Sequence, residues 1–143
     1  MSAPDLAPAP ADLTALTVGD EIHGQFGPIT RTQLVRYAGA GGDFNPIHHD
    51  EEFAKSAGMP GVFSMGLFHG GVAGGWLAAW LGLEHVTALK LRFTGQVWPG
   101  DVLSLHARVD DIEEHADGRL IICSLLVERQ NGDVALKGEV RAR

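Results

Sequence analysis

GLFHGGVAGGWLAAWL, residues 66–81, is an uncharged, glycine-rich stretch from which the architecture follows. Its glycines recur at every fourth position along two neighbouring stripes: Gly66, Gly70 and Gly74, with Gly71 and Gly75 beside them. A helix with this spacing has a face without side chains, so another backbone can come close to it. We therefore expect a helix over about 66–81 that the rest of the domain encloses.

The chain after this helix alternates apolar and polar residues, which is the pattern of half-buried strands. Runs of this kind cover 87–97, 102–109, 119–130 and 134–141. They are separated by turn signals: Pro99-Gly100-Asp101, Asp117-Gly118 and the tight-hairpin dipeptide Asn131-Gly132. Consecutive antiparallel strands after one buried helix predict an α+β domain in which a curved sheet wraps around that helix.

Two shorter helices are expected before the glycine-rich one, after a possible strand over 21–29. Thr30 and Gln33 have the form of a capping box, and the glycines of 39–42 would end that helix. The pair Asn45-Pro46 is the next helix start, because asparagine is a favoured N-cap and proline suits the first helical position. This predicts a second helix over about 46–56.

Length and composition indicate one globular domain. The chain has 143 residues, 45% of them hydrophobic, and we expect a disordered Ala- and Pro-rich tail over 1–12 followed by a single domain over 13–143. The net charge of −7 and the lack of a basic block argue against a nucleic-acid partner. A lone cysteine, Cys123, and the absence of a secretory signal pattern fit a cytoplasmic protein.

One segment has the length of a membrane span, because no residue between Lys55 and Glu84 carries a fixed charge. Pro60, eight glycines and the lack of basic or aromatic anchors at its ends argue against that interpretation. The strands that follow can bury the helix instead. We expect no membrane partner.

The chemically distinctive stretch is YAGAGGDFNPIHHD, residues 37–50. Asp43 and His48 flank the predicted start of the second helix. As the third residue of that helix, His48 would feel the positive end of the helix dipole, which favours a neutral ring able to accept a proton. Asp43 can turn toward the same pocket, so the two could hold one water. An isolated pair at this spacing is more often a loop cap and a surface histidine.

The whole string, continued by 51–55 and Gly58, resembles the hydratase signature of the MaoC-like dehydratases, the (R)-specific enoyl-CoA hydratases. The resemblance runs from about Val18 to the C-terminus and includes Pro99-Gly100-Asp101. It implies a hot-dog fold, in which a curved antiparallel sheet wraps a long helix. Such domains usually pair as dimers, with a second copy or with a related subunit.

By position, the resemblance implies that Asp43 and His48 are the catalytic pair and that Asn45 shapes their loop. Enzymes of this family add water across the C2–C3 bond of a trans-2-enoyl thioester, giving an (R)-3-hydroxyacyl product, or run the reverse dehydration. They need no metal or redox cofactor, and coenzyme A or acyl carrier protein enters as part of the substrate. Met65-Gly66 matches the family's His-Gly, which implies that the Gly66 N–H donates to the thioester oxygen.

Two residues depart from the family pattern. Gly41 stands where serine is usual, and Met65 stands where histidine is usual, which removes a polar group near the acyl pocket and could alter substrate choice. Phe44 and Phe63 could border the acyl channel.

Other interpretations stay open. An acyl-CoA thioesterase on the same fold would attack the thioester carbonyl, although the Asn-Pro-Ile-His sequence after Asp43 argues against it. A non-catalytic subunit of a heterodimer would be expected to lack Asp43 or His48. No metal site is predicted, because no metal-ligand spacing to a cysteine or an acid is found for His23, His85, His106 and His115. Two further polar residues are assigned no role in catalysis: Ser64, which has no evident base partner, and His69, expected to be a hydrogen-bonded core histidine.

Overall fold

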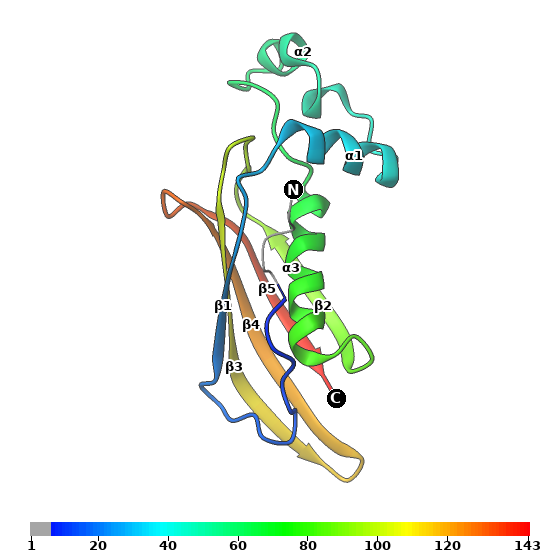
Figure 1. Cartoon of the computed structure of the whole chain (residues 1–143), viewed down its shortest axis with the longest axis vertical. Coiled ribbons are helices and arrows are strands. Elements are labelled where there is room, and N and C mark those ends of the chain that lie inside the picture. The colour runs from blue at the N-terminus through cyan, green and yellow to red at the C-terminus, as the bar shows by residue number, and fades with distance from the viewer. Residues whose placement is uncertain (1–6) are drawn as a thin grey trace.

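The computed structural model describes residues 7–143 and shows one curved antiparallel sheet wrapped around a long helix, α3 (Gly66–Leu81) (Figure 1). The sheet has the strand order β1-β3-β4-β5-β2. Its strands are β1 (Glu21–Phe26), β2 (Val86–Phe93), β3 (Leu103–His115), β4 (Gly118–Arg129) and β5 (Val134–Ala142). The predicted α+β hot-dog architecture is confirmed, and β1 and β2 are the edge strands of the sheet.

The core lies between α3 and the concave face of the sheet. Trp76, Leu77 and Leu81 of the helix are buried against alternate residues of the central strands. In β3 the buried positions are Leu103, Leu105, Ala107 and Val109, which is the period of two read from the sequence. The thiol of Cys123 is buried in the same core, and burial raises its pKa to about 12.

The first glycine stripe of α3 faces β2, where it lies against side chains and not against the bare backbone. A β-carbon added at Gly66 would lie 3.1 Å from the Phe93 ring, and one at Gly74 would lie 3.2 Å from Leu89. The second stripe behaves differently, because a β-carbon at Gly71 or Gly75 would meet no atom of the described chain within 4 Å. Only one of the two stripes is therefore used to pack helix against sheet within this chain.

The first short helix, α1 (Arg31–Gly41), has the predicted Thr30–Gln33 capping box and ends at Gly42 with a φ of 70°. The prediction of one continuous helix over 46–56 is wrong. The segment forms a 3-10 helix, η1 (Pro46–His48), and then a separate helix, α2 (Glu51–Ser56). The reason is a second cap: the Asp50 carboxylate accepts the Phe53 N–H at 3.0 Å and starts a new helix there.

The predicted strand over 87–97 ends early, at Phe93. The backbone N–H groups of Thr94 and Gly95 both point to the carbonyl of Ala135, so the chain leaves the ladder at that point. Farther on, the Val97 carbonyl accepts a hydrogen bond from the Ser64 N–H at 2.7 Å. This contact ties the segment after β2 to the segment that leads into α3.

The Pro99-Gly100-Asp101 turn is held by a buried ion pair. The Asp101 carboxylate accepts hydrogen bonds from Arg129 Nε at 2.7 Å, from Gln130 Nε2 at 2.7 Å and from the Trp98 N–H at 2.8 Å. Burial alone would raise the pKa of Asp101, but these donors outweigh it and lower the pKa. The turn thereby fixes Trp98, whose ring contacts Phe63 with a centroid separation of 5.6 Å.

The N-terminal segment runs along the outside of this core. Residues 1–6 of the predicted tail lie outside the described part of the chain, and within it the Ala11 N–H donates to the Trp80 carbonyl at 2.8 Å. The Arg119 guanidinium donates to the carbonyls of Leu13 and Leu16. In residues 7–143 there is no helix with both the length and the apolar character needed to cross a membrane.

Candidate active site

The fold brings Asp43 and His48 together. Asp43 lies in the loop that follows α1, and His48 is the last residue of η1. His48 Nε2 is 3.8 Å from an Asp43 carboxylate oxygen. The His48 side chain is 11% exposed and that of Asp43 is 44% exposed, so the pair joins a partly buried ring to a carboxylate that water can reach.

The orientation of the His48 ring is set by a backbone carbonyl. Nδ1 of His48 lies 2.7 Å from the carbonyl oxygen of Phe63, and the two rings meet edge to face at 5.1 Å. A carbonyl oxygen can only accept, so Nδ1 carries the proton. In the neutral ring Nε2 then presents a lone pair toward Asp43. The predicted dipole of a long helix does not act here, because η1 has only three residues.

Asn45 shapes the loop between the two members of the pair. Its backbone N–H points to an Asp43 carboxylate oxygen at 3.4 Å, and its side-chain oxygen accepts the Ile47 N–H at 3.1 Å. Phe44 is exposed on the surface, where its carbonyl lies 3.3 Å from Nε2 of His49. The structure therefore places Asn45 beside the pair and directs Phe44 toward solvent.

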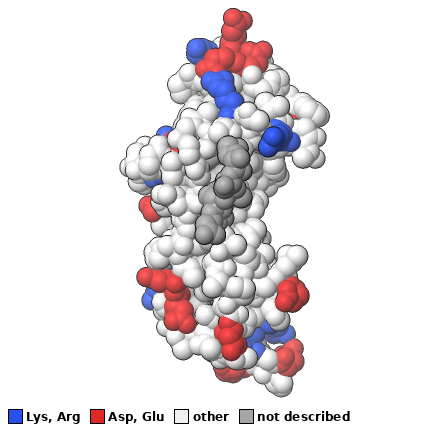
Figure 2. All heavy atoms as spheres, in the orientation of Figure 1, with Lys and Arg blue, Asp and Glu red and all other residues white. Residues whose placement is uncertain are grey.

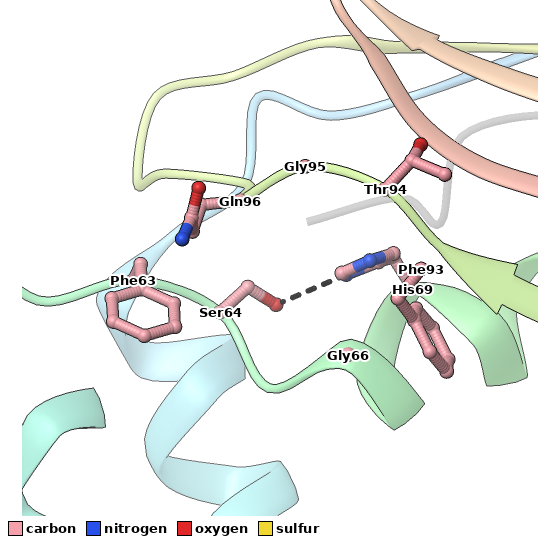
Figure 3. A pocket seen from close by; sticks show the side chains of 8 residues that line it. All are labelled: Phe63, Ser64, Gly66, His69, Phe93, Thr94, Gly95 and Gln96. Carbon is pink, nitrogen blue, oxygen red and sulfur yellow. Dashed lines mark hydrogen bonds between the residues drawn. The ribbon is translucent and has the colours of Figure 1, made fainter.

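A pocket of about 360 Å³ lies beside the start of α3 (Figure 3). Eight residues line it: Phe63, Ser64, Gly66, His69, Phe93, Thr94, Gly95 and Gln96. Asp43 and His48 are not among them, and Met65 is buried in the core. Phe63 connects the pocket to the Asp43–His48 pair, because it lines the pocket while its carbonyl oxygen accepts the hydrogen bond from His48.

Gly66 is the first residue of α3 and opens onto this pocket. Met65 precedes it as the cap residue and makes no side-chain hydrogen bond to the helix start. The first N–H groups of a helix have no partner within the helix, so the Gly66 N–H can be offered to a ligand. The Phe93 ring, partly exposed, covers the glycine from the side of β2.

Comparison with known proteins shows which family this chain belongs to. The model of the MaoC-like domain matches residues 16–128, which include the pair and Gly66. The chain belongs to the MaoC-like domain family. The resemblance noted in the stretch 37–50 is thereby confirmed over most of the chain.

Three relatives illustrate the family. This MaoC-like domain is 31% identical over 114 residues to the enoyl-CoA hydratase ChsH3 of Mycobacterium tuberculosis, covering 78% of this chain and 37% of that protein. It is 45% identical over 67 residues to the 3-hydroxyacyl-thioester dehydratase Y of the same organism, covering 44% and 23%. A solved MaoC-like dehydratase superposes with a TM-score of 0.82 at 27% identity, over 99% of this chain and 42% of that one. The chain thus spans less than half the length of each.

One polar contact of the MaoC-like domain was missed by sequence reasoning. Ser64 Oγ lies 3.5 Å from Nδ1 of His69, a neighbour that the sequence did not indicate. The two residues are five apart across the start of α3, a spacing that brings side chains together only when the chain turns into a helix there. Ser64 also donates to the Met65 carbonyl at 3.1 Å, and burial lowers the pKa of His69 to about 4, which makes this ring a poor base.

A second missed cluster concerns metal ligands. The β1–β3 register sets His23 directly opposite His106, with their rings stacked at 4.4 Å. The Glu21 carboxylate lies 3.6 Å from His23 and 3.0 Å from His106, and one ligand atom from each residue falls within 4.8 Å of the others. These are residue types that bind zinc. The prediction of no metal site considered only spacing along the chain. It therefore missed the pairing of His23 with His106, which the register of β1 against β3 creates.

Proposed function

We propose that this MaoC-like domain hydrates a trans-2-enoyl thioester to the (R)-3-hydroxyacyl thioester and catalyses the reverse dehydration. The observation that carries the proposal is the placement of His48 Nε2 at 3.8 Å from the Asp43 carboxylate, with Nδ1 occupied by the Phe63 carbonyl. A lone pair and a carboxylate that face each other can bind one water between them. The (R) outcome is proposed from the resemblance of the stretch 37–50 to (R)-specific hydratases.

The chemistry follows from this arrangement. Asp43 accepts one hydrogen bond from the water, and His48 Nε2 takes the other proton as the water oxygen attacks C3. Electrons from the C2–C3 bond move toward the thioester oxygen, where the Gly66 N–H would stabilise the developing charge. The proton held by the pair is then returned to C2. The sum is the addition of one hydrogen and one hydroxyl, with no net oxidation or reduction.

Cofactors and substrate follow from the same chemistry. Addition of water needs no electron acceptor, and the proposed route assigns charge stabilisation to a backbone N–H, so we propose that no metal or redox cofactor takes part. Coenzyme A or acyl carrier protein would be the carrier portion of the substrate.

The lone, buried Cys123 cannot form a disulfide within the chain, which supports a cytoplasmic location.

Crotonyl-CoA tests the activity. Hydration consumes the conjugated thioester chromophore without releasing thiol, and chiral analysis of the product reports the (R) outcome. A thioesterase would release free thiol instead, and a non-catalytic subunit would do neither. Release of one thiol for each chromophore lost, or no reaction at all with enoyl thioesters of several chain lengths, would contradict the proposal.

We further propose that the domain pairs with a second hot-dog subunit through the side formed by α3 and β2. Leu67 is 65% exposed there, one helical turn before the open Gly71, and Leu89 and Phe93 are partly exposed on the adjoining edge strand. In Figure 2 the charged side chains on the visible face gather toward the two ends and are sparse between them. Edge strands and exposed apolar side chains are commonly covered by a partner.

Sedimentation equilibrium checks the pairing. A homodimer gives twice the chain mass of 15.2 kDa, and Leu67→Glu should return the mass to that of one chain. Val35→Glu is the matched control, because Val35 is an exposed apolar residue that belongs to α1 and not to α3 or β2. A wild-type mass near 15.2 kDa at micromolar concentration would contradict self-association and leave pairing with a related subunit as the remaining form.

A further inference from the structure

The buried imidazole of His69 has one nitrogen for which the protein provides no partner. His69 is 2% exposed, and within residues 7–143 its Nε2 is the one buried side-chain nitrogen or oxygen without a hydrogen bond. Buried polar atoms in native proteins are nearly always paired with protein, water or ligand. The hydration pair does not use His69, so this atom needs another explanation.

The ring is placed where a ligand could reach it. Figure 3 shows His69 beside Ser64 at the start of α3, with Thr94, Gly95 and Gln96 across the pocket. Helical side chains lean toward the N-terminal end of their helix, so His69 faces the same pocket as Gly66, three residues earlier. A volume of about 360 Å³ is enough for a small-molecule group.

The hydrogen bonds around the ring decide which kind of group fits. The Ser64 hydroxyl donates to the Met65 carbonyl at 3.1 Å, so its oxygen is left to accept from Nδ1 of His69 at 3.5 Å. The Nδ1 proton then leaves Nε2 as a lone pair. Burial keeps the ring neutral at pH 7, since it lowers the pKa of His69 to about 4. A neutral acceptor in a buried place selects a neutral donor.

We propose that Nε2 of His69 accepts a hydrogen bond from a neutral N–H or O–H group of the bound acyl thioester, which makes the pocket beside Gly66 a specificity subsite. This inference rests on the proposed function. Two parts of the substrate could supply the donor. One is the amide N–H of the carrier arm, two methylenes beyond the thioester sulfur. The other is a hydroxyl on the acyl chain.

Binding of saturated thioesters tests the subsite, because they cannot be hydrated. The first arm compares, by calorimetry, butyryl-N-acetylcysteamine with the analogue in which oxygen replaces the amide N–H. The second arm compares the S-ethyl thioesters of 6-hydroxyhexanoic and hexanoic acid. In whichever arm contains the correct donor, the wild type should bind the donor-bearing compound about tenfold more tightly than its matched analogue. His69→Leu should abolish this preference, and His69→Gln, whose amide oxygen can accept at a similar reach, should retain most of it.

Two further measurements separate this role from a structural one. The Tm of His69→Leu should fall no further than that of Ser64→Ala, which removes the same Ser64–His69 contact, because Nε2 makes no hydrogen bond that leucine would remove. In the wild type, the ¹⁵N resonance of Nε2 should be that of an unprotonated nitrogen and should move only with the donor-bearing compound. This resonance is measurable even if the leucine variant does not fold.

The outcomes are distinct. Equal binding in both arms, a preference that survives His69→Leu, or a protonated Nε2 overturns the inference while hydration of crotonyl-CoA can still stand. A preference lost in His69→Leu, in a protein that does not hydrate enoyl thioesters, supports the subsite and overturns the proposed function instead.

Discussion

The carbonyl oxygen of Phe63 accepts a hydrogen bond from Nδ1 of His48 at 2.7 Å. This contact joins two segments that lie fifteen residues apart in the chain. It directs the other nitrogen of His48 toward Asp43, and it ties the pair to Phe63, which lines the pocket together with Gly66. The backbone before α3 therefore positions both the proposed base and the proposed oxyanion donor.

Replacing either member of the pair should stop catalysis without unfolding the domain. Asp43→Asn and His48→Ala should each lower the rate of crotonyl-CoA hydration about 10²–10⁴-fold, the usual contribution of general acid–base groups. Because both act on one water, the double variant should be scarcely slower than the slower single variant. Initial rates together with thermal melts measure this. A near-wild-type rate in a folded single variant would remove that residue from the mechanism.

The Gly66 N–H can be deleted with a matched control. Proline suits the first position of a helix, and Met65 already has the extended φ and ψ of −61° and 135° that precede proline well. Gly66→Pro should lower turnover about 10²–10³-fold. Gly66→Ala adds the same β-carbon near Phe93 but keeps the N–H, so it should stay within a few-fold of the wild type. Equal rates in the two variants would place the oxyanion donor elsewhere.

The glycine stripe on α3 should respond to alanine differently from a glycine in open surroundings. At Gly70 a β-carbon would lie 3.1 Å from Leu91 and 3.3 Å from Phe93, whereas at Gly39 in α1 it would meet nothing within 4 Å of the described chain. We expect Gly39→Ala to raise the free energy of unfolding by about 0.5–1 kcal/mol through helix propensity. Gly70→Ala should lower it by about 1–3 kcal/mol through overpacking. Urea denaturation measures both changes in the free energy of unfolding. Equal changes in the two variants would show that the side chains of β2 can move aside for the added methyl group.

His69 should make stability depend on pH between 6.5 and 4. Its pKa falls from 6.5 to about 4 on folding, so below pH 6.5 the unfolded chain takes up a proton that the folded chain does not. The free energy of unfolding is therefore undiminished above pH 6.5 and declines as the pH falls toward 4. His69→Gln removes this contribution. From pH 7 to pH 5 the wild type should lose about 2 kcal/mol more than the variant in urea denaturation, and parallel losses would contradict a buried neutral ring.

Much of the fold could be predicted because its signals are local. The Thr30–Gln33 box and the period of two in β3 each depend on residues near one another in the chain, and both form as expected. The hairpin at Asn131-Gly132 also forms, but its connection is longer than the dipeptide predicts, because the Gly132 N–H donates to the Arg129 carbonyl and only then does the chain enter β5. Two of the errors in element bounds have causes that the structure shows directly. Asp50 competes as a cap within the segment 46–56, and the Ala135 carbonyl draws the chain out of the ladder after Phe93.

The candidate site also combines residues that the local sequence indicates with contacts that only the fold creates. The sequence alone was enough to select Asp43, Asn45 and His48, because they belong to one short stretch. The pair Asp43 and His48 still comes together in the structure, although the predicted helix over 46–56 is divided in two. The tie of His48 to Phe63, the contact of Ser64 with His69 and the stacking of His23 on His106 became visible only in three dimensions. Each depends on how a segment turns into α3 or on the register of β1 against β3. Such contacts are set by packing between distant parts of the chain, which no local pattern encodes.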